Sequence, residues 1–93
     1  MQSLMVKLYL QLLGSYLIVQ SPGQYDPLVD ELADLEPVGT ILTREQAKRL
    51  IVRLLALRHK YNIKHFGGFY GRYLKVWPFP RWFLSATVTL SPC

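Results

Sequence analysis

Residues 4–19 read LMVKLYLQLLGSYLIV, and this stretch decides the fold because its pattern suits two kinds of secondary structure. Polar residues recur every four positions from Ser3 to Ser15, as in a narrow polar stripe on a helix. Because four is a multiple of two, the same residues also line one face of a strand. Gly14 and Ser15 form a Gly-x pair between two apolar runs, which is typical of a type II′ hairpin turn. The turn signal favours a β-hairpin with strands near residues 4–12 and 16–20.

The expected hairpin separates its side chains into two kinds of face. If Leu13 pairs with Tyr16, one face is wholly apolar, as an antiparallel hairpin on a core requires. The run is about 16 residues long, shorter than the roughly 20 that a spanning helix needs, and it includes Lys7 and Gln11. No small-x-small cleavage site follows it. We therefore expect neither a membrane span nor a signal peptide.

A short acidic helix is expected at about residues 27–35. Asp26 and Pro27 are typical of an N-cap followed by proline at the first helical position. Asp30 and Glu31 fall in the first turns, where the helix dipole favours acids. Pro37 ends the segment.

A longer helix is expected from Arg44 to about Lys60. Thr43 and Gln46 have the spacing of a capping box, in which each side chain accepts a hydrogen bond from the other residue's backbone N–H. At 100° per residue one face is apolar; it consists of Ala47, Leu50, Ile51, Leu54 and Leu57. Arg49, Arg53 and Lys60 fall together on the opposite side, so this helix is amphipathic and basic.

The C-terminal third has the pattern of a second hairpin. Residues 70–77 alternate as a strand, residues 78–81 (Pro-Phe-Pro-Arg) indicate a turn because proline lacks a backbone N–H, and residues 82–90 alternate again. The order β-β-α-α-β-β predicts an α+β fold, an antiparallel sheet with helices on one face. We expect one small domain over residues 1–93, since no linker divides the chain.

The charges are divided between the two halves of the chain. Residues 1–42 contain one base and five acids, a formal charge of −4, whereas residues 43–93 contain ten bases and Glu45, a formal +9; together they give the chain's +5. Nine aromatic residues are interleaved with the bases of the second half. A basic, aromatic-rich region is typical of a surface that binds phosphate or another polyanion.

We therefore expect a small non-enzymatic nucleic-acid-binding protein. The residues expected to contact the backbone are Arg49, Arg53, Lys60, Lys64, Arg72 and Lys75, and those expected to stack on bases are Phe69, Tyr70 and Tyr73. Two alternatives stay open. The basic stripe is a solvated face or pairs with the acidic helix of the same chain, and the aromatics pack in the core or across strands.

A protein-interaction module, a subunit or an inhibitor that docks on a larger assembly is the second expectation. Hydrophobic residues make up 51% of the chain and charged residues 18%, so apolar surface is expected to stay exposed, as in a homodimer or larger assembly. The expected partner-binding residues lie at the tip of the second hairpin, where Phe79 should be exposed: Trp77, Phe79, Arg81 and Trp82. Peripheral attachment to an anionic membrane is a third alternative.

No motif in the sequence indicates catalysis, a metal or a cofactor. His59 and His65 lack the Cys or carboxylate spacing of a metal site, and no Ser or Cys has a histidine nearby in a nucleophile context. Cys93 is the only cysteine, so no internal disulfide forms and a cytoplasmic location is the default expectation.

Overall fold

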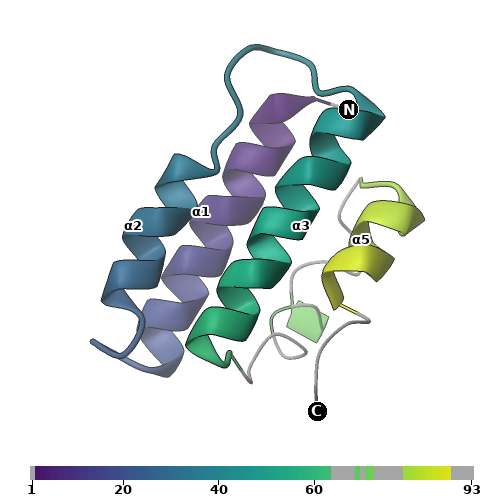
Figure 1. Ribbon diagram of the computed structural model, residues 1–93. Coiled ribbons are helices and arrows are strands. Elements are labelled where there is room, and N and C mark those ends of the chain that lie inside the picture. The colour runs from purple at the N-terminus through teal and green to yellow at the C-terminus, as the bar shows by residue number, and fades with distance from the viewer. Residues whose placement is uncertain (1, 64–68, 70, 73–78, 89–93) are drawn as a thin grey trace.

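The computed structural model describes residues 2–63, 69, 71–72 and 79–88, and within them the chain is helical and contains no strand. Its elements, labelled as in Figure 1, are α1 (Ser3–Gln20), α2 (Asp26–Asp34), α3 (Arg44–Tyr61) and α5 (Arg81–Val88). Figure 1 shows α1, α2 and α3 lying side by side, with α5 beside α3. The predicted α+β fold with an antiparallel sheet is therefore wrong.

The N-terminal run forms one continuous helix through Gly14, so the predicted hairpin at residues 4–12 and 16–20 is wrong. A Cβ added at Gly14 would lie 3.6 Å from Val29 Cγ1 and 4.0 Å from Leu32 Cδ1, both on α2. The glycine therefore marks the place where α1 and α2 approach closely, not a turn. Of the two periods that the sequence allowed, the helical one prevails, and its buried apolar residues are Val6, Tyr9, Leu10, Leu13, Tyr16 and Leu17.

The loop before α3 returns to the start of α1. The Ser3 N–H donates to the Thr40 carbonyl over 3.1 Å, and the Ser3 hydroxyl donates to the Gly39 carbonyl. An isolated antiparallel bridge joins Gln2 and Ile41. These long-range bonds satisfy the Ser3 N–H in the first turn of α1 and hold the beginning of α1 against the loop that leads into α3.

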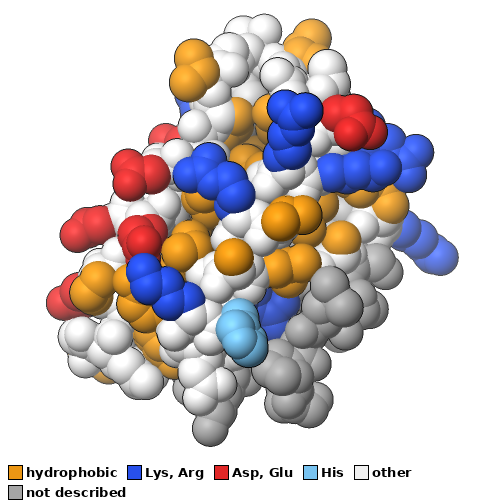
Figure 2. Space-filling view, in the orientation of Figure 1, with side chains coloured by type: hydrophobic (Ala, Val, Ile, Leu, Met, Phe, Trp, Pro, Cys, Tyr) orange, Lys and Arg blue, Asp and Glu red, His pale blue; other side chains and the backbone are white. Residues whose placement is uncertain are grey.

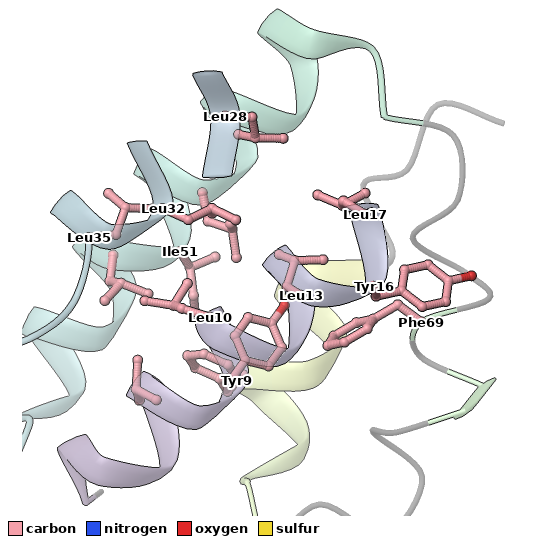
Figure 3. Close-up of a cluster of buried hydrophobic side chains, with 14 of the residues drawn as sticks. Tyr9, Leu10, Leu13, Tyr16, Leu17, Leu28, Leu32, Leu35, Ile51 and Phe69 are labelled. Atoms are coloured by element: carbon pink, nitrogen blue, oxygen red, sulfur yellow. The ribbon is translucent and has the colours of Figure 1, made fainter. Parts of the chain in front are cut away.

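The acidic helix is confirmed as α2, one residue earlier than expected at each end. Pro27 lies in its first turn, as predicted, but Asp26 is already helical and Tyr25 is the N-cap, without a side-chain hydrogen bond. Leu28 and Leu32 are buried toward α1 and the core (Figure 3).

The basic helix is confirmed as α3, including its capping box. The Thr43 N–H donates to Gln46 Oε1 over 2.9 Å, and the Gln46 N–H donates to Thr43 Oγ1 over 3.2 Å. The helix ends at Tyr61, and Asn62 caps it in the left-handed conformation with φ of 51°. The expected apolar face is buried except for Leu57, which is partly buried.

The second hairpin is also wrong where the structure describes it. Residues 81–88 form helix α5, and residues 69, 71 and 72 are helical. The buried residues Phe79, Phe83 and Thr87 are four apart, so the period that matters here is helical rather than the alternation that the sequence also permits. Residues 70, 73–78, 89 and 90 of the predicted strands and turn lie outside the described residues.

An aromatic cluster attaches this C-terminal segment to α1. The Tyr9 ring lies 5.7 Å from Phe69, 5.8 Å from Phe79 and 5.7 Å from Phe83, measured between ring centroids, and two of these contacts are edge-to-face. Figure 3 shows Tyr9 and Tyr16 of α1 beside Phe69. Each such pair contributes about 0.5–1.5 kcal/mol beyond burial of its area.

Buried polar groups lie at the edge of this cluster. Arg58 of α3 is 5% exposed and donates from Nη1 to the Thr87 carbonyl of α5, which joins the two helices. Burial raises the pKa of the Tyr9 hydroxyl, and the neighbouring Thr87 side chain and Arg58 charge partly offset this rise.

Replacing Gly14 with alanine tests the helix against the hairpin. In α1 the new methyl group meets Val29 at ordinary contact distance and removes the glycine penalty, so we expect stabilisation by about 0.5–1 kcal/mol. Gly39→Ala is the matched control: its φ of +97° disfavours alanine, and we expect a loss of about 1–2 kcal/mol. The measurement is urea unfolding followed by circular dichroism. A loss at Gly14 as large as that at Gly39 would contradict the continuous helix.

Candidate functional site: the basic face of α3

The side of α3 that faces away from the core presents a basic surface. Lys48, Arg49, Arg53 and Lys60 are exposed along it, with His59 near its C-terminal end. Figure 2 shows blue Lys and Arg side chains spread over α3, and most of the red Asp and Glu side chains at the left over α2. We call Lys48, Arg49 and Arg53 the basic face.

The bases on α3 differ in whether a carboxylate neutralises them. All six Asp and Glu residues of the chain belong to the described part. Within it, Lys60 Nζ lies 3.3 Å from Glu31 Oε1 and Lys48 Nζ lies 3.8 Å from Glu45 Oε1. Arg49 and Arg53 form no ion pair with any of these six carboxylates, so their charge is available to an external anion.

The acidic helix borders the basic face on one side. A hollow of about 250 Å³ between α2 and α3 is lined by Glu31, Asp34, Leu35, Arg53, Ala56 and Leu57. Lys60 forms an ion pair with Glu31 of α2, in line with the alternative that the basic stripe pairs with the acidic helix of the same chain. Arg53 lines the hollow together with Glu31 and Asp34 but forms no salt bridge with them. Arg49 does not line this hollow and has no carboxylate partner, so electrostatic attraction for a polyanion is stronger there than at Arg53.

Glu31 receives two donors from the end of α3. The Tyr61 hydroxyl donates to Glu31 Oε2, and Lys60 donates to Oε1 over 3.3 Å. The Tyr61 hydrogen bond, with a smaller contribution from Lys60, lowers the pKa of the Glu31 carboxyl, and the same bond to a carboxylate raises the pKa of Tyr61. This cluster fixes the C-terminal end of α3 on α2.

Of the residues predicted to bind nucleic acid, the described aromatic one is buried and the described basic ones are exposed. Phe69 is fully buried, with its ring 5.6 Å from that of Tyr16, so in this structure it presents no face to a nucleic-acid base. Arg72 is exposed. The remaining expected contacts, Lys64, Tyr70, Tyr73 and Lys75, lie outside the described residues.

The predicted partner-binding tip is not a hairpin tip. Phe79 is 7% exposed, so the expectation that it would be exposed is wrong; it packs 4.6 Å from Phe83 between ring centroids. Arg81 is exposed and Trp82 is partly buried, with the Arg44 guanidinium 5.0 Å from its ring centroid. Trp77 lies outside the described residues.

Sequence reasoning missed three basic residues of α3. Arg58 continues the buried series 47, 51, 54 at helical spacing, so the periodicity already placed it inward. Lys48 is exposed and follows Arg44 by one turn, on the same side of α3. Arg44 was assigned to the helix start, and nothing in the sequence indicated that it would lie over Trp82.

Neither a metal site nor a membrane-spanning helix is established by the described residues. Among the described residues no group of three or more His, Cys, Asp or Glu side chains is arranged to hold a metal ion. One helix, α1, is long and apolar enough to cross a membrane by length and composition, and 39% of it is buried inside the fold. Core helices of soluble proteins and signal sequences meet the same criteria, and the absence of a membrane span stays a prediction.

No protein-family model matches the chain, and no similar curated protein or solved structure is found. The case for a function therefore rests on the chain's own residues.

Replacing Tyr61 with phenylalanine tests the Glu31 cluster. Because the hydroxyl is the largest cause of the lowered pKa, its loss should raise the pKa of Glu31 toward the ordinary value. A lowered folded-state pKa stabilises the protein above the unfolded pKa, and this stability is lost as pH falls through the folded value. The variant should therefore show a weaker loss of stability on acidification. An NMR pH titration of the Glu31 side chain checks this, with Lys60→Met expected to give a smaller shift; an unchanged Glu31 titration in Tyr61→Phe would contradict the hydrogen bond.

Proposed function

We propose that this protein is a non-enzymatic nucleic-acid-binding protein that contacts the phosphate backbone through the basic face of α3. The observation that supports this most directly is that Arg49 and Arg53 are exposed on one side of the helix without a carboxylate partner among the described residues. They are one helical turn apart, about 6 Å along the axis. Arginine side chains at this spacing suit successive anionic groups, because each guanidinium presents a fork of donors.

The mode of binding follows from what the surface lacks. Phe69 is buried, so it contributes no stacking, and exposed side chains beside the arginines on α3 include Val52 and Ala56. Neither reads a base edge by hydrogen bonding. Binding is then mainly electrostatic and tolerant of sequence, as phosphate contacts are.

The acids of α2 restrict where the nucleic acid lies. Glu31 and Asp34 face Arg53 across the hollow between α2 and α3, and they repel a phosphate placed there. Lys60 already binds Glu31. The backbone therefore passes over Arg49, with Arg53 at the edge of the contact.

A salt series with alanine variants tests this proposal. With two or three phosphate contacts, the slope of log K against log salt should be about −2 to −3 on duplex DNA, and Arg49→Ala should reduce it by about one. Lys60→Ala is the matched control, since its charge is engaged by Glu31 and its loss should change the affinity far less. The measurement is fluorescence anisotropy with labelled single- and double-stranded oligonucleotides. Absence of binding at low salt, or equal effects of both variants, would reject the basic face.

Self-association is a second candidate, supported by the exposed side of α1. Four large hydrophobic residues of this helix are exposed, Leu4 by 61%, Leu8 by 39%, Ile18 by 45% and Val19 by 72%. Leu4, Leu8 and Ile18 belong with Gln11 and Ser15 to a row spaced 4, 3, 4, 3, which is the spacing of a helix–helix seam. A second copy of α1 would cover this row, with Gln11 near its middle.

Measurement of mass across a concentration series tests this second candidate. We expect a monomer–dimer equilibrium that Leu8→Glu shifts to the monomer, because a charge in the seam is costly to bury. Val38→Glu is the control, since Val38 is 98% exposed and lies in the loop between α2 and α3, outside the row. A monomer at all concentrations, or equal effects of both variants, would reject self-association through α1.

A further inference from the structure

A pocket lies where the beginnings of α1, α3 and α5 meet. It has a volume of about 500 Å³ and is lined by Gln2, Met5, Leu42, Arg44, Phe79, Pro80 and Trp82. Five of these seven side chains are apolar. The volume lies within the range of about 300–1,000 Å³ that is usual for small-molecule sites. An apolar wall with few polar groups is the usual composition of such a site.

Arg44 supplies the charge of this pocket. Its guanidinium lies 5.0 Å from the centroid of the Trp82 ring, and it forms no ion pair with any of the chain's six Asp and Glu side chains. This cation–π contact places the guanidinium at the pocket, and its N–H donors, which no Asp or Glu of the chain engages, can bind a carboxylate.

The surroundings of the pocket favour an anion over a cation. The first turns of α1 and α5 contain no acidic residue, and the acid in the first turn of α3, Glu45, is paired with Lys48. Arg81 is exposed next to the pocket residues Pro80 and Trp82. The formal charges of these turns therefore sum in favour of a negative ligand.

We propose that this pocket binds a small organic anion with an apolar body and one carboxylate. The apolar body occupies the space between Met5, Leu42 and Trp82, and the carboxylate accepts hydrogen bonds from Arg44. The site is independent of the basic face, because Arg44 turns toward α5 whereas Arg49 and Arg53 lie on the solvent side of α3.

The test compares a carboxylate with its neutral amide. The probes are 4-cyclohexylbutanoate and 4-cyclohexylbutanamide, which have the same apolar body and do not absorb where tryptophan is excited. The chain has two tryptophans, so titrations use a Trp77→Phe background in which the emission comes from Trp82. We expect the carboxylate to change this emission saturably and to bind more tightly than the amide.

Two variants assign the charge to Arg44. Arg44→Gln should weaken carboxylate binding by about tenfold or more, the effect of losing a charge-assisted hydrogen bond, and leave amide binding unchanged. Arg49→Gln removes the same charge from the same helix outside the pocket and should change neither. Both residues are exposed, so circular dichroism should show the fold retained in both variants.

Three outcomes would overturn the proposal. They are no saturable change in Trp82 emission with the carboxylate, equal binding of the carboxylate and the amide, and equal weakening by Arg44→Gln and Arg49→Gln. The last would mean that the net charge of the chain, rather than this pocket, attracts the anion.

Discussion

Two contacts of α1 hold the fold together, Gly14 against α2 and Tyr9 against the aromatic rings of the C-terminal segment. The first brings α1 and α2 close together, so that a Cβ at Gly14 would already lie at ordinary contact distance from Val29 and Leu32. The second depends on a large ring that contacts Phe69, Phe79 and Phe83 together. Since α3 is joined to α2 through Glu31 and to α5 through Arg58, the position of the basic helix follows from these two contacts.

The sequence identified elements whose signals are local and missed those whose signals are not. The capping box of Thr43 and Gln46 depends on a few neighbouring residues, and it forms as predicted. The acidic helix follows from Pro27 and the acids of the first turns, again within a few positions. By contrast, the sequence around Gly14 suits both a hairpin turn and a contact between helices. What distinguishes the two is the contact with Val29 of α2, fifteen residues farther along the chain. An alternating pattern in residues 82–88 was equally ambiguous, because Phe83 and Thr87 satisfy a period of four as well as of two.

The residues of the candidate site likewise fall into those that local sequence signals could place and those that they could not. Exposure of Arg49 and Arg53 followed from the amphipathic pattern of one helix, so the sequence was sufficient to place them. Predicting that Lys60 pairs with Glu31 would have required knowing that α2 and α3 are neighbours, and the sequence composition does not show this. The burial of Phe69 required the position of Tyr9 and Tyr16 on a helix that was expected to be a hairpin. Errors in the fold of α1 therefore became errors in the expected aromatic surface.

The placement of charge also explains how the two proposed anion-binding regions fit on one helix. Residues 44, 48, 49 and 53 are all basic, but successive residues of a helix turn by 100°, so Arg44 points toward α5 and Trp82 while Arg49 and Arg53 face outward. The outward side is open and bordered by acids, which suits an extended polyanion that contacts a few charges and is sensitive to salt. The inward side combines one guanidinium with apolar walls, which suits a compact ligand whose apolar part is removed from water. A single basic helix thus presents two different chemistries, and the position of α5 creates the difference.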